Sequence, residues 1–224
     1  MRNRRVLTVA ASCAFAVGGP SCVGFNTFQT ASTLGESNLQ FAVEPSAWGA
    51  ADDGADYVYP RLDFTARYGL NDRTDLGLRL GSTGVELQSK FLLTRPGEAG
   101  FIASVAPSIG GFFVGAGELD SASLYLSLPL LLGFGFGNGS QWVFGPKLIG
   151  WGVAGGDGAD AAGALYAGAS VGVALRLGER FRLMPEVGVV YPIVTLGNAG
   201  AAVDNAGIAG YVGYQVGLGF LFGG

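Results

Sequence analysis

The sequence of 224 residues contains no histidine, and this absence excludes several classes of enzyme site. A Ser-His-Asp triad, an Asp-His protease pair and a histidine-dependent acylase or phospholipase all use an imidazole as general base. Histidine is also the most common metal ligand, and the only thiols are those of Cys13 and Cys22. The chain shows no motif for catalysis by carboxylate, lysine or tyrosine groups alone. We therefore predict that it is not an enzyme and has no cofactor and no metal site.

Basic charge is scarce. Charged residues make up 13% of the chain, with thirteen Lys and Arg against seventeen Asp and Glu. Three of the basic residues, Arg2, Arg4 and Arg5, belong to the N-terminal segment; without them ten basic and seventeen acidic residues remain, a net charge of −7. Because a phosphate backbone selects a basic surface, we expect no nucleic-acid partner. The sequence identifies no protein partner.

The pattern of a long helix is also missing. Glycine accounts for 40 residues, and each glycine inside a helix costs about 1 kcal/mol relative to alanine. The uncharged stretch Ser121–Pro146 leaves a helical membrane protein as one alternative, but Pro129 and the alternate glycines of 133–137 interrupt it. A soluble secreted β-sandwich is the other alternative. An apolar content of 49% is too high for a disordered chain.

The N-terminus has the features of an export signal. Its three arginines precede the apolar stretch Val6–Gly18, which is too short to span a membrane well as a helix. We assign residues 1–21 to a signal peptide. The small Ser21 directly before Cys22 is the arrangement that bacterial lipoproteins use for acylation, although Gly19 and Pro20 depart from the usual pattern. We predict lipidation at Cys22, with a plain signal peptide as the alternative, and a periplasmic tether over residues 22–37.

From residue 38 to residue 224 the chain alternates between large apolar and small or polar residues, which is the period of a strand with two different surroundings. Ten segments show this pattern: Asn38–Trp48, Val58–Tyr68, Asp75–Gly81, Val85–Leu93, Phe101–Phe113, Ser123–Phe136, Trp142–Val153, Ala164–Leu177, Arg182–Leu196 and Ile208–Phe222. Most are long enough to cross a bilayer when tilted, which takes about 9–11 residues. We predict an all-β fold: a single up-and-down antiparallel transmembrane β-barrel of about 10 strands, with 8 or 12 as alternatives.

The connections between these segments alternate in length and charge. One set is short and contains Arg73, Arg95 and Arg180, whereas the other is mostly longer and has no basic residue. The longer set contains Asp52, Asp53, Asp56, Glu118, Asp120, Asp157, Asp160 and Asp204. Short periplasmic turns and longer surface loops are typical of outer-membrane barrels, so we predict the outer membrane of a Gram-negative bacterium as the location. An even number of strands places both termini on the same side.

The stretch Cys22–Phe41 resembles the start of a group of poorly characterised bacterial outer-membrane β-barrel proteins. In that group an acylated Cys is followed by a Gln-Thr-Ala-x-Thr-Leu-Gly segment, which is matched here by Gln29, Thr30, Ala31, Thr33, Leu34 and Gly35. The stretch Arg67–Leu80 resembles the first inner hairpin of the group, with Asn71 and Asp72 suited to its turn. The resemblance implies a fold and a location, but no reaction.

Alternation directs a mixed set of polar residues toward the lumen: Glu44, Arg61, Asp63, Arg67, Arg79, Glu86, Gln88, Lys90, Lys147, Arg176, Arg182, Glu186 and Gln215. We predict that five of them form one network: Arg61, Asp63, Arg79, Glu86 and Lys90. Unpaired charge in a confined lumen is costly, so this mixture favours a largely plugged, charge-paired interior. The predicted function is therefore that of a structural or surface-interaction protein. A narrow porin-like channel for small solutes is the alternative.

The opposite faces of the strands are predicted to contact outer-membrane lipid. They carry Phe41, Leu62, Phe64, Leu76, Leu78, Leu80, Leu87, Phe91, Leu124, Leu126, Leu128, Leu130, Leu132, Val171, Val173, Leu175 and Val189. Aromatic residues near the predicted strand ends suit a girdle at the membrane surface: Trp48, Tyr57, Tyr59, Tyr68, Trp142, Phe181 and Tyr211. Lipopolysaccharide is the second expected contact. The repeated Asp-Gly-Ala-Asp tetrads of 53–56 and 157–160 could share divalent cations with its phosphates, but solvated acidic loops explain them better.

Overall fold

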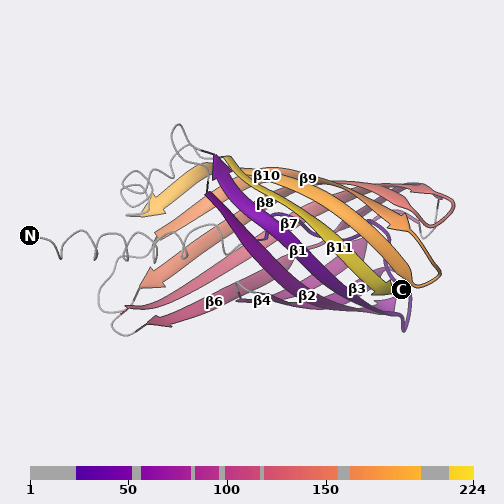
Figure 1. Ribbon diagram of the computed structural model, residues 1–224, viewed down its shortest axis with the longest axis horizontal. Coiled ribbons are helices and arrows are strands. Elements are labelled where there is room, and N and C mark those ends of the chain that lie inside the picture. Colours follow the sequence, from indigo (N-terminus) through magenta and orange to yellow (C-terminus); the bar gives the residue numbers. More distant parts are fainter. Residues whose placement is uncertain are drawn as a thin grey trace, which may run out of the picture.

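The computed structural model of this chain describes residues 24–51, 57–81, 84–95, 99–116, 119–155, 162–197 and 212–224. In these ranges the regular elements are β-strands, and Figure 1 shows them wound into an antiparallel barrel. Within the same ranges, no helix has the length and apolar character needed to cross a membrane. The strands are β1 (Leu39–Ala51), β2 (Tyr57–Asn71), β3 (Thr74–Gly81), β4 (Gly84–Leu92), β5 (Ala99–Val105), β6 (Ser108–Ala116), β7 (Leu119–Phe136), β8 (Gln141–Gly155), β9 (Ala162–Arg176), β10 (Phe181–Gly197) and β11 (Val212–Gly223).

The sheet closes on itself because β1 pairs with β2 on one side and with β11 on the other. Strands β5 and β6 share one position in the ring, since both lie between β4 and β7. The break between them falls at Ala106 and Pro107, where proline has no N–H to donate. Ser89 and Pro129 continue the pairing across the break, through Ser89 N–H to Pro107 O and Ala106 N–H to Pro129 O. The ring therefore has ten positions, as the sequence predicted.

The two ends of the barrel differ in the connections that they carry. The turn end carries the short connections 72–73, 137–140 and 177–180. The loop end is the opposite one, where residues 52–56, 82–83, 117–118, 156–161 and 198–211 lie outside the described part of the chain. The acidic tetrads and most of the predicted acidic loop residues belong to these ranges. Cys22 and the predicted signal peptide, residues 1–21, also lie outside the described part of the chain.

The outer face of the barrel is apolar. On β7, Leu124, Leu126 and Leu128 are each at least half exposed, whereas Tyr125 between them is buried. The same alternation runs through the other strands, and the predicted lipid-facing residues lie on this outer surface. A soluble monomer rarely exposes a continuous apolar patch larger than a few hundred Å². The outer surface is therefore suited to hydrocarbon rather than to water.

The segment before β1 lies inside the barrel, and this differs from the periplasmic tether expected for residues 22–37. Phe25 and Phe28 are 1% exposed and Ala31 is fully buried. The Leu34 N–H bonds Asp75 near the turn end, whereas Phe25 packs against Trp48 in the loop-end half of β1. We call residues 24–34 the lumen segment. The described chain therefore begins inside the lumen. The first and last strands nevertheless start and finish at the same end, since Gln40 pairs with Gly223 at the turn end, as the even number of strands predicted.

Gly69 of β2 contacts the chain where it turns from the lumen segment into β1. A substitution at Gly69 therefore tests this packing. The Gly69 N–H donates to Asn38 O and its carbonyl accepts from Ser37 N–H, both at 2.9 Å. A Cβ atom at Gly69 would overlap the backbone carbonyl of Gly35, whereas one at Gly150 would meet nothing within 4 Å.

We expect Gly69→Ala to lower the free energy of unfolding by about 1–3 kcal/mol, because the backbone at Gly35 must move. Gly150→Ala is the matched control, with a change of less than about 0.5 kcal/mol. Urea unfolding in detergent micelles measures both values. Equal stability of the two variants would contradict the close packing of Gly35 on β2.

Candidate functional site

The lumen contains buried charges of both signs in equal number. Among the described residues, five buried cationic side chains face five buried carboxylates; they are Arg61, Arg67, Arg79, Lys90 and Lys147, and Glu44, Asp63, Asp75, Glu86 and Glu186. A charge removed from water destabilises a protein unless it is paired and hydrogen-bonded. The balance therefore matches a lumen that is filled rather than open.

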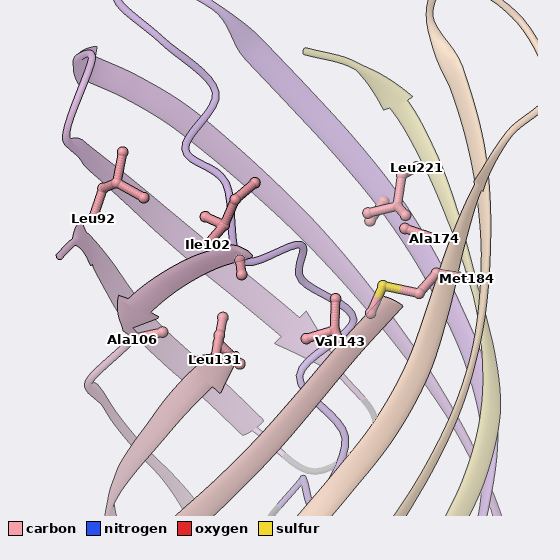
Figure 2. Close-up of a cluster of buried hydrophobic side chains, with 10 residues drawn as sticks. Leu92, Ile102, Ala106, Leu131, Val143, Ala174, Met184 and Leu221 are labelled. Atoms are coloured by element: carbon pink, nitrogen blue, oxygen red, sulfur yellow. The ribbon is translucent and has the colours of Figure 1, made fainter. Parts of the chain in front are cut away.

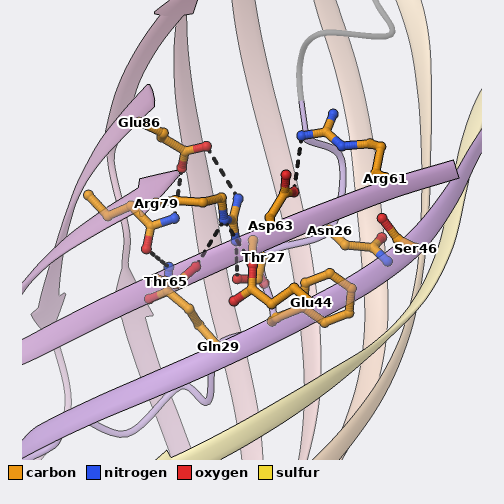
Figure 3. A network of polar contacts seen from close by, with 12 residues as sticks. Asn26, Thr27, Gln29, Glu44, Ser46, Arg61, Asp63, Thr65, Arg79 and Glu86 are labelled. Carbon is orange, nitrogen blue, oxygen red and sulfur yellow. Dashed lines mark hydrogen bonds and ion pairs between the residues drawn. The ribbon is translucent and has the colours of Figure 1, made fainter. Parts of the chain in front are cut away.

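Arg79 lies at the centre of the polar network drawn in Figure 3. Its Nε is 3.0 Å from Glu44 Oε2, and its Nη1 is 3.2 Å from Glu86 Oε2. Glu44 also pairs with Arg67, whose Nη2 lies 3.1 Å from Oε1. The Tyr125 hydroxyl donates a hydrogen bond of 2.7 Å to Glu86 Oε2. The network thus ties β1, β2, β3, β4 and β7 together across the lumen.

Membership of this network differs from the prediction. Lys90 forms its ion pair with Asp75 at 2.9 Å, nearer the turn end, and Asp75 was not among the predicted lumen residues. Glu44, which the five-residue network omitted, links Arg67 to Arg79. Asp75 lies two residues before Gly77 and four before Arg79, so alternation along β3 could have placed it on the inner face.

The lumen segment donates its backbone N–H groups to acidic and amide side chains of the barrel. Glu186 accepts from two successive residues, with Thr27 N and Phe28 N each 2.7 Å from a carboxylate oxygen. Gln215 Oε1 accepts from Phe25 N at 2.6 Å. Nearer the turn end, further N–H groups bond Gln141 Oε1, at 2.5 Å from Ala31 N, and Asp75 Oδ1, at 3.0 Å from Leu34 N.

The carbonyl groups of the same segment accept from basic side chains. Arg79 Nη2 donates to Thr27 O at 2.8 Å and Arg67 Nη2 donates to the same oxygen at 3.3 Å. The ammonium of Lys147 bonds Phe25 O. Toward the turn end, Thr30 O accepts from Lys90 Nζ at 3.4 Å and Ala31 O from the Ser104 hydroxyl. Bonds with an ionised partner are roughly twice as strong as neutral ones, so the segment is held firmly.

Lys147 and Glu186 depend on the lumen segment more than the other buried charges do. In the described part of the chain neither has a partner of opposite charge within 4.0 Å; Lys147 donates to Phe25 O, and the Glu186 carboxylate accepts from Thr27 and Phe28. Removing the segment would leave both ions without these hydrogen bonds. The backbone of the lumen segment therefore takes the place of an ionic partner for Lys147 and Glu186.

Two phenylalanines of the segment fit into spaces that glycines leave on the inner face of β11. A Cβ atom at Gly213 would lie 2.8 Å from the Phe25 ring, and one at Gly217 would lie 2.7 Å from the Phe28 ring. The Phe25 ring packs on Trp48, with centroids 6.1 Å apart, and Trp48 packs on Tyr59. Trp48 is thus buried and Tyr59 packs on it within the lumen, which corrects the prediction that they belong to a lipid-facing girdle.

Apolar side chains pack around Ala31 inside the lumen. Figure 2 shows Ile102, Leu131, Val143 and Met184 converging from β5, β7, β8 and β10, and each is at most 3% exposed. Sequence reasoning missed this layer because it considered only the polar members of the inward-facing set. A small polar cavity of about 10 Å³ remains beside residues 24–29, with room for about one water molecule.

Three further residues were predicted to face the lumen, namely Arg176, Arg182 and Gln88. Arg176 is half-buried at the turn end and its Nε donates to Gly178 O, while Arg182 Nε reaches Gly139 O at 3.5 Å. Gln88 is buried in the lumen and accepts from Gln29 of the lumen segment at 3.2 Å. Within the described ranges, no group of three or more potential ligands could hold a metal ion.

Substitution of Arg79 and Glu86 tests whether the lumen is shielded from water. We expect Arg79→Gln and Glu86→Gln each to lower the free energy of unfolding by about 3–5 kcal/mol, because each leaves a buried ion unpaired. The double variant should lose less than the sum of the two, since neither ion then remains. Glu36→Gln, which changes an exposed carboxylate, is the matched control. Additive losses of about 0–1 kcal/mol would indicate a wet lumen instead.

No protein-family model matches the chain, and neither does any curated protein. Among solved structures, outer-membrane β-barrel proteins are similar in outline. Neisserial surface protein A is 8% identical with a TM-score of 0.33, covering 82% of this chain and 96% of its own. The attachment invasion locus protein Ail of Yersinia pestis is 12% identical with a TM-score of 0.32, covering 84% and 99%. The outer membrane protein OprG of Pseudomonas aeruginosa is 12% identical with a TM-score of 0.37, covering 87% and 99%. The strand pairing described above, rather than these scores, establishes the barrel fold.

Proposed function

We propose that this chain is an integral outer-membrane protein of a Gram-negative bacterium, with a barrel closed by its own lumen segment and a structural or surface-interaction role. The observation that carries the proposal is the burial of the lumen segment between the charged side chains of the inner face. Its backbone occupies the centre of the lumen and is hydrogen-bonded to β2, β3, β4, β5, β8, β10 and β11.

The outer surface supports the membrane location. Large apolar side chains are exposed on strands around the ring, and most strands are long enough for a bilayer. Tyr68, Trp142 and Phe136 are exposed near the turn end of their strands, at the height where an aromatic girdle contacts the lipid headgroups. We propose that this surface contacts outer-membrane lipid, with lipopolysaccharide around its loop-end half.

The inner surface favours a role without catalysis. In the described lumen, the acidic and basic side chains pair with one another or bind the backbone of the lumen segment. The buried groups are occupied in holding the barrel and the segment together.

The alternative function is a narrow channel that conducts when the lumen segment leaves. The same contacts support it, because Lys147, Glu186, Arg67 and Arg79 would then line an aqueous path. Closed and open states would differ only in the position of the segment. The distinction is therefore measurable as ion conductance.

In planar bilayers we expect the full chain to be silent, because the lumen segment fills the path. Glu186→Gln removes the charge that binds two successive N–H groups of the segment, and we expect it to produce intermittent openings. The matched control is Glu179→Gln, which alters an exposed carboxylate in the turn between β9 and β10 and should stay silent. Steady conductance of the unmodified chain would contradict the closed barrel and favour the channel.

A further inference from the structure

The lumen segment has a direction, which its successive partners define. Leu34 bonds Asp75, the second residue of β3 from the turn end, and Ala31 bonds Gln141, the first residue of β8. Further toward the N-terminus, each residue meets a partner deeper in the barrel. Thr27 meets Glu186, the sixth residue of β10 from the turn end, and Phe25 meets Gln215, the ninth residue of β11 from the turn end. The chain thus passes from the loop-end half of the lumen to the turn end as it approaches β1.

Gly24 is the described residue farthest from the turn end along this path. A Cβ atom on it would lie 3.3 Å from Arg79 and 3.7 Å from Arg61, and Arg61 is only four residues from the loop end of β2. Two residues of extended chain span at most about 7 Å, so Cys22 lies within that distance of Gly24. The lumen segment therefore directs its N-terminal end, at Gly24, toward the loop end.

The barrel recognises the main chain of the segment more than its side chains. Six backbone N–H groups, those of residues 25–28, 31 and 34, bond carboxylate or amide oxygens of the barrel. Four carbonyls, those of residues 25, 27, 30 and 31, accept from barrel side chains. Side-chain selection comes from the glycine-made spaces that hold Phe25 and Phe28. It also comes from the side chains of Asn26, Thr27 and Gln29, which hydrogen-bond the barrel. These are the contacts of a site for an extended polypeptide in one orientation.

We propose that the lumen is a binding site for an extended polypeptide, that the lumen segment of this chain is its occupant, and that it is threaded outward. From this direction we expect the chain that precedes Gly24 to leave the barrel at the loop end, on the outer surface of the cell. This inference rests on the proposed outer-membrane location. It changes the meaning of the predicted lipidation, because an acyl group on Cys22 would be presented at the loop end rather than in the periplasmic leaflet.

Cysteine labelling on intact cells tests the direction of threading. Val23→Cys is made in the full chain with Cys13→Ser and Cys22→Ser and is treated with a membrane-impermeant maleimide before and after permeabilisation of the outer membrane. Asp53→Cys, between β1 and β2, is the loop-end control, and Asn71→Cys is the turn-end control. We expect Val23→Cys to be labelled on intact cells to the same extent as Asp53→Cys, with Asn71→Cys labelled only after permeabilisation.

Labelling of Val23→Cys only after permeabilisation, or in neither state, would overturn the outward threading. If Asp53→Cys is itself unlabelled on intact cells, the proposed membrane orientation fails instead, so the two failures are distinguishable. A second variant retains Cys22, in case its replacement prevents export, and carries a ten-residue epitope between Val23 and Gly24. Antibody binding to this epitope on intact cells supports the proposal, and binding only after permeabilisation overturns it.

Discussion

Charge that is buried away from water must be paired, and the interior of this barrel is arranged around that requirement. Arg79 is held between Glu44 and Glu86, so β1, β3 and β4 share one ion network. Lys147 and Glu186, on the other side of the ring, have no such ionic partner in the described chain and bind the backbone of the lumen segment instead. The charged side chains of the barrel are therefore paired either with each other or with the backbone of the segment, and the proposed closed lumen follows from that pairing.

Shape complements this charge balance. Glycines at alternate positions of β11 remove side chains from the inner face where Phe25 and Phe28 insert. On the outer face of the same strand, Val212, Val216 and Leu218 stay exposed and apolar. One alternating pattern thus serves two requirements, hydrocarbon contact on the outside and space for a polypeptide on the inside.

Prediction from sequence succeeded where each residue's surroundings depend on the strand period. The ten ring positions and the outward apolar residues follow from alternation, because successive side chains on a strand point to opposite faces of the sheet, here lipid and lumen. It failed where the partner is distant in sequence. Trp48 and Tyr59 were expected in a girdle because they lie near strand ends, but Trp48 is buried in the lumen under Phe25 and Tyr59 packs against it.

The sequence by itself determined the barrel: alternation, glycine content and strand length leave a closed sheet with an apolar exterior as the stable arrangement. Only the tertiary structure decided what fills it. Residues 24–34 are uncharged, and their apolar members Phe25, Phe28, Ala31 and Leu34 recur at every third position. This is not the period of a strand, so alternation did not indicate their location. Their backbone is bound by side chains more than a hundred residues away, such as Gln141, Glu186 and Gln215. Those side chains come together only when the ring closes. The position of the lumen segment could therefore be found from the folded barrel but not from the sequence.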